Sequence, residues 1–197
     1  MKKLVTLCLC LAVCSVLFLA GSAFAQQKNV RVNIVTSEGN IVLELWPDKA
    51  PATVENFLKY AKAGFYEGTT FHRVISNFMI QGGGFDENLK PKRGMFEPIV
   101  NEADNGEKNR PYTIAMARTG HPHSATNEFF INVQDNKSLN FKSKSMEGYG
   151  YCVFGEVYAG KNVVDKIRDT PVKAKGPMPF AHVPVKPVVI KRVEVLP

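Results

Sequence analysis

Apolar and polar residues alternate along residues 30–46, on both sides of a short polar segment. The apolar positions are Val30, Val32, Ile34, Ile41, Leu43 and Leu45. Side chains of a strand point to opposite faces in turn, so this period of two predicts two strands, each with one buried face. The segment between them, Ser37-Glu38-Gly39-Asn40, is typical of a turn. The pattern therefore predicts an antiparallel hairpin that ends before Pro47.

Two segments instead show the period of an α-helix. In residues 51–63 the apolar side chains fall at i, i+3, i+4 and i+7, namely at Val54, Phe57, Leu58 and Ala61. This spacing predicts one apolar stripe on a helix, with Pro51 in its first turn and Gly64 after its end. A second, shorter helix is expected over residues 161–169, and Pro171 ends it.

The rest of the chain predicts more strands, separated by long polar loops. Strands are expected in 69–81, 111–117, 128–133, 149–157 and 187–196. The loops 82–110 and 118–127 are rich in Gly, Pro, Asn and Asp, and loops this long in a compact domain usually help to form a site. Many strands of this length most often form a sandwich or a closed barrel. We therefore expect a single, mainly β domain with two short helices.

The first 25 residues differ from this domain. Met1-Lys2-Lys3 precedes an uncharged, apolar run that extends from Leu4 to Ala25 and ends in Ala23-Phe24-Ala25. A basic start, an apolar run and a small-x-small site predict a cleaved signal peptide. The alternative is a membrane anchor, because about 20 apolar residues can span a bilayer. We predict cleavage after Ala25, a mature domain of residues 26–197, and a periplasmic location, with secretion as the alternative.

Composition agrees with a folded, soluble domain. Hydrophobic residues make up 45% of the 197 residues and charged residues 22%, which excludes a disordered chain. The net charge is +7, and cleavage would leave 172 residues with a charge of +5, because Lys2 and Lys3 are lost. Of the four cysteines only Cys152 would remain, so no internal disulfide is possible. Its apolar surroundings predict a buried, inert thiol.

Several kinds of functional site are not indicated. Gly82-Gly83-Gly84 lacks the ending of a phosphate-binding loop, and Asn101–Gly106 lacks the alternating oxygen ligands of a calcium loop. His121 and His123 have no third ligand at metal-site spacing. The sequence contains no nucleophile elbow, and its Lys and Arg residues are scattered rather than in a nucleic-acid-binding stripe. No cofactor and no nucleic-acid partner is implied.

One segment combines a cation, apolar side chains and an amide at neighbouring positions. It runs Phe71-His72-Arg73-Val74-Ile75-Ser76-Asn77-Phe78-Met79-Ile80-Gln81-Gly82-Gly83. Arg73, Ile75 and the residues from Phe78 to Gln81 cannot share one face of a straight strand. We therefore expect a bend at Ser76-Asn77.

This segment resembles the signature of the cyclophilin family of peptidyl-prolyl cis-trans isomerases. The similarity continues in the same order through residues 30–196. It includes Asn101-Glu102, Gly106, Ile114-Ala115-Met116-Ala117, Ser124, Phe129-Phe130-Ile131, Val153-Phe154-Gly155-Glu156-Val157 and the helix from Val163 to Ile167. The sequence looks most like exported cyclophilins of Gram-negative bacteria. The resemblance implies a closed eight-stranded antiparallel β-barrel capped by two short α-helices.

The resemblance also implies which residues act on an X-Pro bond. Arg73 would be the catalytic residue, donating to the proline nitrogen as the amide twists, and Gln81 would hydrogen-bond the substrate backbone beside it. Ala117 and Arg118 match the strand that pairs with the substrate. The apolar pocket for the proline ring would be formed by Phe78, Met79, Phe130 and Leu139, with Tyr151 as an aromatic wall.

Three positions depart from the common family pattern. Ser138 stands where many eukaryotic members carry a Trp that is important for cyclosporin binding, which implies weak cyclosporin affinity; Phe141 is a candidate to fill that space. Tyr151 replaces a common His, and Glu128 replaces a common Gln.

The expected partners are proline-containing segments of unfolded or flexible exported proteins, bound by a monomer with no stable membrane association after cleavage. A non-catalytic, peptide-binding chaperone that uses the same groove is the alternative function. A lipocalin-like carrier of small molecules is a third interpretation, which the family resemblance disfavours.

Overall fold

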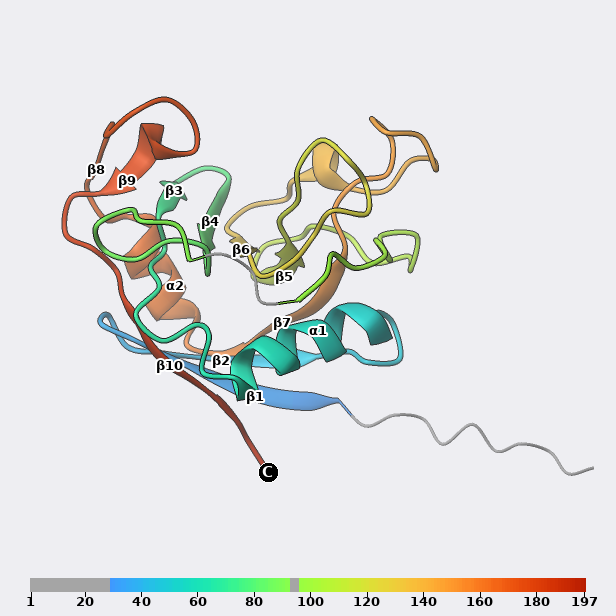
Figure 1. The fold of residues 1–197 in the computed structure, drawn as a ribbon, viewed down its shortest axis with the longest axis horizontal. Helices are drawn as coiled ribbons and strands as arrows, with labels where there is room; N and C mark the ends of the chain where they lie inside the picture. The colour runs from blue at the N-terminus through green and yellow to red at the C-terminus, as the bar shows by residue number, and fades with distance from the viewer. Residues whose placement is uncertain (1–28, 93–95) are drawn as a thin grey trace, which may run out of the picture.

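The structure, a computed structural model, describes residues 29–92 and 96–197, so the predicted signal peptide of residues 1–25 lies outside the described residues (Figure 1). Eight strands form one antiparallel sheet in the order β10-β1-β2-β7-β5-β6-β4-β3. These strands are β1 (Val30–Thr36), β2 (Asn40–Leu45), β3 (Arg73–Ile75), β4 (Met79–Gly82), β5 (Thr113–Met116), β6 (Phe129–Asn132), β7 (Val153–Ala159) and β10 (Ile190–Val195).

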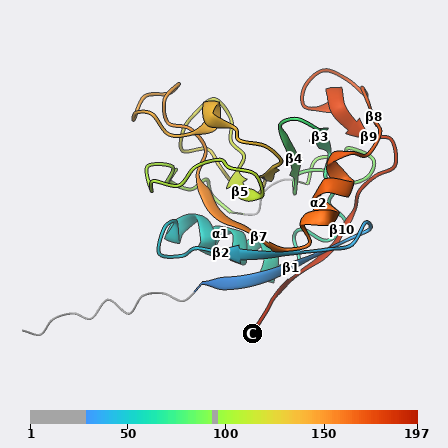
Figure 2. The ribbon, with the colours of Figure 1, turned by 180° about the vertical axis from the view of Figure 1, so that it is seen from behind.

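Two α-helices, α1 (Pro51–Lys62) and α2 (Lys161–Arg168), pack against this sheet. Helix α1 contacts β10, and α2 contacts β2, β3 and β4. The view from behind shows α2 beside β3 and β4 (Figure 2). No helix within the described residues is both long enough and apolar enough to cross a membrane.

The predicted hairpin and both predicted helices are confirmed, and so is the bend at Ser76-Asn77, where a turn separates β3 from β4. Two predicted strands begin later than expected: the strand of 149–157 begins at Val153, and the strand of 187–196 begins at Ile190. Sequence patterns missed two short 3-10 helices, η1 (Lys137–Leu139) and η2 (Phe180–His182). They also missed the two-residue strands β8 (Val172–Lys173) and β9 (Val183–Pro184), which form a small separate sheet.

The expected closed barrel is wrong, because the two end strands of the sheet, β10 and β3, do not pair. The chain just before β3 approaches β10 instead, through one bridge between Thr70 and Val189 and through flanking backbone hydrogen bonds. The N–H of Phe71 donates to Val188 over 2.9 Å. Strand β3 has only three residues, all of them beyond this approach, so the eight strands form an open, curled sheet.

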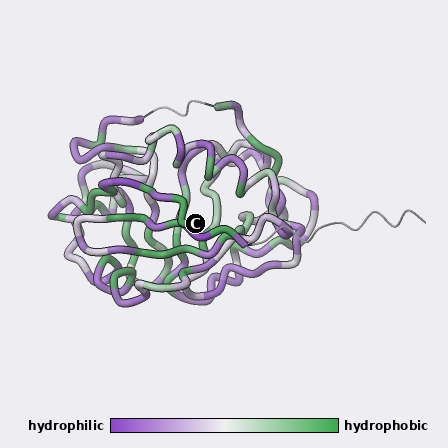
Figure 3. The backbone as a smooth tube through the Cα atoms, turned by 90° about the horizontal axis from the view of Figure 1, so that it is seen from below, coloured by the Kyte–Doolittle hydropathy of each residue, from purple (hydrophilic) through white to green (hydrophobic). Residues whose placement is uncertain are grey.

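Aromatic side chains fill the interior of this curled sheet. Phe57 of α1 is fully buried, and its ring centroid lies 5.2–5.6 Å from those of Tyr66, Phe129 and Phe154. The backbone coloured by hydropathy shows hydrophobic stretches passing through the interior and hydrophilic ones in the outer loops (Figure 3). Burial of apolar surface is therefore the main stabilising contribution.

The start of α1 is capped by a residue from a distant loop. Ala50, at the N-cap position, offers no side-chain hydrogen bond. The Glu102 carboxylate instead accepts the N–H of Ala52 at 3.1 Å and both the N–H and the hydroxyl of Thr53, at 2.9 and 2.7 Å. These bonds satisfy donors that the first turn of a helix leaves free and place an anion at the positive end of the helix dipole.

Replacing Glu102 by alanine is therefore expected to lower the free energy of unfolding by about 1–2 kcal/mol, the usual cost of losing a helix cap. Urea denaturation measures this loss. Glu147→Ala, which removes an exposed carboxylate of another loop, is the control and should leave the midpoint unchanged. Equal midpoints for the two variants would refute the capping role.

Candidate active site

One face of the sheet carries a continuous row of side chains across four strands. The strand register places Arg73 opposite Gln81, Gln81 opposite Phe130, and Phe130 opposite Ala115. Because residues directly opposite each other in a sheet share a face, these side chains lie next to one another. The neighbours of Phe130 in the chain, Phe129 and Ile131, point to the other face and belong to the main core.

A smaller apolar cluster lies on this face of the sheet, separate from the main core. Its buried members are Met79, Ala115, Phe130 and Val153. Half-buried apolar side chains pack against it, and they are Trp46, Ile75, Phe78, Ala117, Leu139 and Tyr151. The ring of Tyr151 meets that of Phe130 edge to face at 5.6 Å.

Six members of this cluster form the floor of a cleft of about 520 Å³, namely Phe78, Met79, Ala117, Phe130, Leu139 and Tyr151. The structure brings all nine residues that the family resemblance singled out to the walls of this cleft. They are Arg73, Phe78, Met79, Gln81, Ala117, Arg118, Phe130, Leu139 and Tyr151. Two further lining residues, Met178 and Pro179, were not predicted. They lie in the segment between β8 (Val172–Lys173) and β9 (Val183–Pro184), whose sequence carries no periodic pattern that would place it at a site.

Tight backbone contacts position the two ends of the apolar floor. The N–H of Phe78 donates to Ile75 at 2.9 Å, which closes the turn between β3 and β4, and the buried Asn136 amide donates to the Phe78 carbonyl at 2.7 Å. On the other side, the N–H of Tyr151 donates to the carbonyl of Leu139 at 2.9 Å. The floor is thus held in place by the fold.

Arg73 presents a partly free guanidinium to the cleft. Its Nη1 donates to Oε1 of Gln81 at 3.2 Å, whereas its buried Nε has no hydrogen-bond partner among the described residues. Burial lowers the pKa of Arg73 from its ordinary value, yet a guanidinium keeps its proton at neutral pH. The guanidinium of Arg73 is therefore a charged donor in the wall of the cleft.

Glu128 fixes the orientation of Gln81. The Gln81 Nε2 donates to Oε2 of Glu128 at 2.8 Å, which turns the amide oxygen of Gln81 toward Arg73. Gly84 makes room for this carboxylate, because a Cβ at residue 84 would lie 2.4 Å from Oε1 of Glu128. The carboxylate of Glu128, where a Gln is common, thus ends the chain Arg73–Gln81–Glu128 with a group that only accepts.

His72 also faces Glu128, with Nε2 at 3.5 Å from Oε2 of the carboxylate. Burial lowers the pKa of His72 to about 4, so the imidazole is neutral at pH 7 and the contact is not an ion pair. Burial also raises the pKa of Glu128, although the hydrogen bond from Gln81 opposes this shift.

A raised carboxyl pKa in the folded state means that ionisation of Glu128 costs stability as pH rises above the ordinary range of a carboxyl group. Glu128→Gln is therefore expected to be more stable than the wild type at pH 7.5. The difference should vanish as pH falls and Glu128 becomes protonated. Urea denaturation at pH 4 and pH 7.5 measures it, with the exposed Glu147→Gln as control. Lower stability of Glu128→Gln at pH 7.5 would mean that the carboxylate stabilises the fold by an ion pair.

Arg118 uses its side chain to hold the rim of the cleft. Its Nε donates to Gly150 at 2.9 Å and its Nη1 to Thr119 at 2.9 Å, while the guanidinium lies 4.6 Å from the Tyr151 ring centroid. The backbone around Arg118 stays in line with β5, because the N–H of Ala117 donates to Glu128 at 2.9 Å.

The space at Ser138 is not filled by the aromatic residue that we considered for it. Ser138 is exposed in η1. Phe141 packs against the main core and meets Tyr149 edge to face at 5.6 Å, and it does not line the cleft.

The other candidate groups have structural partners. Cys152 is buried beside the Thr53 hydroxyl, and burial raises the pKa of its thiol to about 12. Nδ1 of His123 accepts the N–H of Asn101 at 3.0 Å. Within residues 29–92 and 96–197, no three His, Cys, Asp or Glu side chains are grouped so that they could hold a metal ion.

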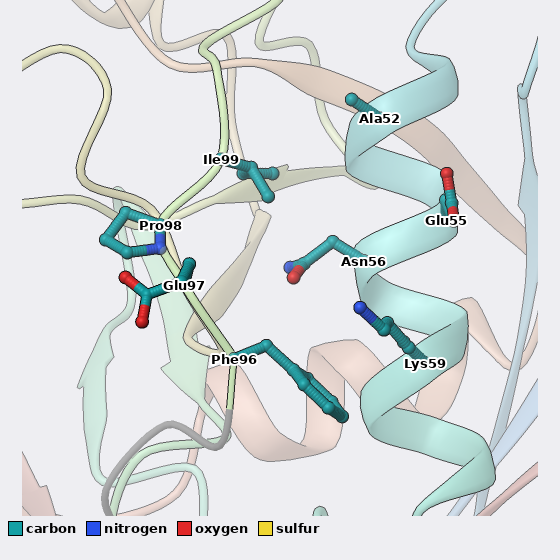
Figure 4. A pocket seen from close by; sticks show the side chains of 8 residues that line it. All are labelled: Ala52, Glu55, Asn56, Lys59, Phe96, Glu97, Pro98 and Ile99. Atoms are coloured by element: carbon teal, nitrogen blue, oxygen red, sulfur yellow. The ribbon is translucent and has the colours of Figure 1, made fainter.

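A second cleft, of about 500 Å³, lies between α1 and residues 96–99 (Figure 4). The Asn56 amide in it donates to Thr126 at 2.6 Å, and the Lys59 ammonium lies 4.5 Å from the ring centroid of Phe96. Asn56 and Lys59 are therefore engaged with the fold, whereas the cleft at Arg73 places a charged guanidinium beside an apolar floor.

Comparisons with known proteins agree on one family. The family model of the cyclophilin-type peptidyl-prolyl cis-trans isomerases matches residues 31–195. The chain belongs to this family. Two proteins named peptidyl-prolyl cis-trans isomerase are similar to it. That of Streptomyces antibioticus is 55% identical over 84% of this chain and 98% of its own length. Isomerase B of Escherichia coli K12 is 53% identical over 83% of this chain and 98% of its own length.

Isomerase A of Dickeya dadantii is 47% identical over 88% of both chains. A crystal structure of a cyclophilin of Cryptosporidium parvum, in the presence of the dipeptide Ala-Pro, superimposes with a TM-score of 0.71. It is 25% identical and covers 85% of this chain and 99% of its own. The fold is thus cyclophilin-like, mainly β with two helices. Family and homologues support one activity, the cis-trans isomerisation of X-Pro peptide bonds.

Proposed function

We propose that this cyclophilin isomerises X-Pro bonds of unfolded or flexible polypeptides in the cleft at Arg73, and that it does so on exported proteins in the periplasm. The observation that carries the proposal is the charged guanidinium of Arg73 in the wall of a cleft, beside a fixed apolar floor. The mechanism follows from the chemistry of the amide bond.

Amide resonance sets a barrier of about 18–20 kcal/mol to rotation of the X-Pro bond. As the bond twists, the proline nitrogen becomes pyramidal and gains a localised lone pair. The guanidinium of Arg73 can donate to this nitrogen in the twisted state, which stabilises the transition state more than the planar substrate. No bond to carbon forms or breaks, so the reaction needs no nucleophile.

The remaining residues of the cleft would bind and orient the substrate. The proline ring would lie on Phe130, Met79, Phe78 and Leu139, with Tyr151 beside it. Gln81, oriented by Glu128, would hold Arg73 in place and bond the substrate backbone. The backbone of Ala117 and Arg118 would align the bound chain, since the Arg118 side chain is engaged with the rim.

The test is isomerisation of a short X-Pro peptide by the purified protein, monitored by protease-coupled absorbance or exchange NMR. Acceleration of the isomerisation supports the proposal. A folded protein that binds the peptide and leaves the rate unchanged would support the peptide-binding chaperone instead.

We also propose a periplasmic location and weak cyclosporin binding. The sequence of residues 1–25 supports export, and finding the protein in the periplasmic fraction with Gln26 as its first residue would establish it. Weak cyclosporin binding is expected because Ser138 is small and exposed and Phe141 packs elsewhere.

A further inference from the structure

The segment between β8 and β9, residues 174–182, folds back onto the cleft at Arg73. Its 3-10 helix η2 packs against β3, the strand that carries Arg73, and the views of Figures 1 and 2 both place this segment beside β3. Met178 and Pro179, at its tip, line the same cleft as Arg73, Gln81 and Phe130. The cleft therefore extends beyond the apolar floor that suits the proline ring.

Aromatic contacts hold this segment in place. The ring of Phe180 meets Phe85 edge to face at 5.1 Å, and Phe85 meets the buried His72 at 4.6 Å. Two backbone hydrogen bonds of 2.8 Å, from Lys175 to Phe180 and from Phe180 to Pro177, close the segment on itself. Met178 and Pro179 are thus presented by a loop that is anchored through Phe180 and Phe85.

Met178 stays 56% exposed although it lines the cleft. Methionine is flexible and polarisable, so it adapts to apolar side chains of different shapes. With a pyrrolidine ring next to it, this part of the wall offers apolar contact and no side-chain hydrogen bond. Met178 and Pro179 themselves offer a charged side chain no hydrogen-bond partner, so this part of the wall favours an apolar one.

From this we infer that Met178 and Pro179 form a second subsite, which binds a large apolar side chain flanking the isomerised X-Pro bond. The inference rests on the proposed function, because its occupant is the polypeptide bound for isomerisation. A cleft of about 520 Å³ lies in the range that encloses a small ligand and has room for a second side chain beside the proline ring. The subsite selects among substrates by the residue next to the proline.

The test compares kcat/KM within two series of peptides. In the first series the residue before the proline is Ala, Leu, Phe or Glu. In the second series the residue after the proline is varied in the same way. In one of the two series the wild type should prefer Leu and Phe over Ala by about five-fold, the effect of partial burial of an apolar side chain. Met178→Ser should reduce this ratio toward one, and Met178→Leu should retain it.

Met146→Ser is the matched control, because Met146 is 53% exposed in another loop and does not line the cleft. It should keep the wild-type ratio. A ratio that Met178→Ser leaves unchanged, or a preference for Glu, would overturn the subsite. If the wild type turns over all the peptides with the same kcat/KM, the subsite alone is refuted. If it turns over none of them, the proposed function is refuted and the subsite with it.

Discussion

Replacing Arg73 by alanine is expected to lower kcat for an X-Pro peptide by about 10²–10³-fold, the usual cost of removing one preorganised donor to a developing charge. The side chain is half-buried in the wall of the cleft, and its Nη1 donates to Gln81. Because Arg73 lies outside the main core, the variant should keep the far-UV circular dichroism of the wild type. The rate is measured with the protease-coupled assay.

Arg73→Lys tests whether the guanidinium, rather than positive charge alone, is required. An ammonium is a point charge on a flexible stem and cannot bond Gln81 and the proline nitrogen in the same fixed geometry, so most of the loss should remain. Arg192→Ala, which removes an exposed guanidinium paired with Glu194 on β10, is the matched control and should retain full activity. Wild-type rates in Arg73→Ala would exclude Arg73 as the catalytic residue.

Replacing Phe57 by alanine is expected to lower the free energy of unfolding by about 3–5 kcal/mol, the range for truncating a buried Phe. The ring is fully buried where α1 enters the curled sheet, in contact with Tyr66, Phe129 and Phe154. Alanine would leave a cavity among rigid rings, which cannot collapse to fill it. The change in the urea midpoint, at an unchanged m-value, measures this loss.

Two variants control this experiment. Phe57→Leu fills most of the space and should cost clearly less than alanine, whereas Val185→Ala truncates a side chain that is 49% exposed and should change stability by less than about 0.5 kcal/mol. A loss below about 1 kcal/mol in Phe57→Ala would mean that α1 is not anchored by this ring.

Local patterns of apolar residues were enough to predict the strands and the helix that have one buried face. The alternation of residues 30–46 predicted β1 and β2, and the 3.6-residue period of residues 51–63 predicted α1, because in both cases a single apolar face meets the core. The start of β7 was predicted four residues too early, because the apolar residues begin at Tyr149 whereas the strand begins at Val153. Burial and strand pairing are separate properties, and sequence patterns report the first.

The nine site residues were found by resemblance to a family rather than by period or spacing. Alone, the segment that contains Arg73 and Gln81 indicated only a bent strand. The turn at Ser76-Asn77 and the register that follows it bring these two residues face to face across eight positions of the chain. Met178 and Pro179 were missed because an irregular segment joins the cleft by packing Phe180 on Phe85, a contact with no sequence signal.

By itself the sequence determined the mainly β domain, its hairpin and helices, and, through family motifs, the residues around Arg73. Tertiary structure alone decided that the sheet stays open, that Glu128 orients Gln81, and that Met178 and Pro179 extend the cleft. The physical reason is the distance along the chain between the residues involved. Periodicity is a local property, and it indicates only which side of one helix or strand is buried. Pairing of end strands, side-chain hydrogen bonds between strands, and loop docking depend on residues far apart in the chain.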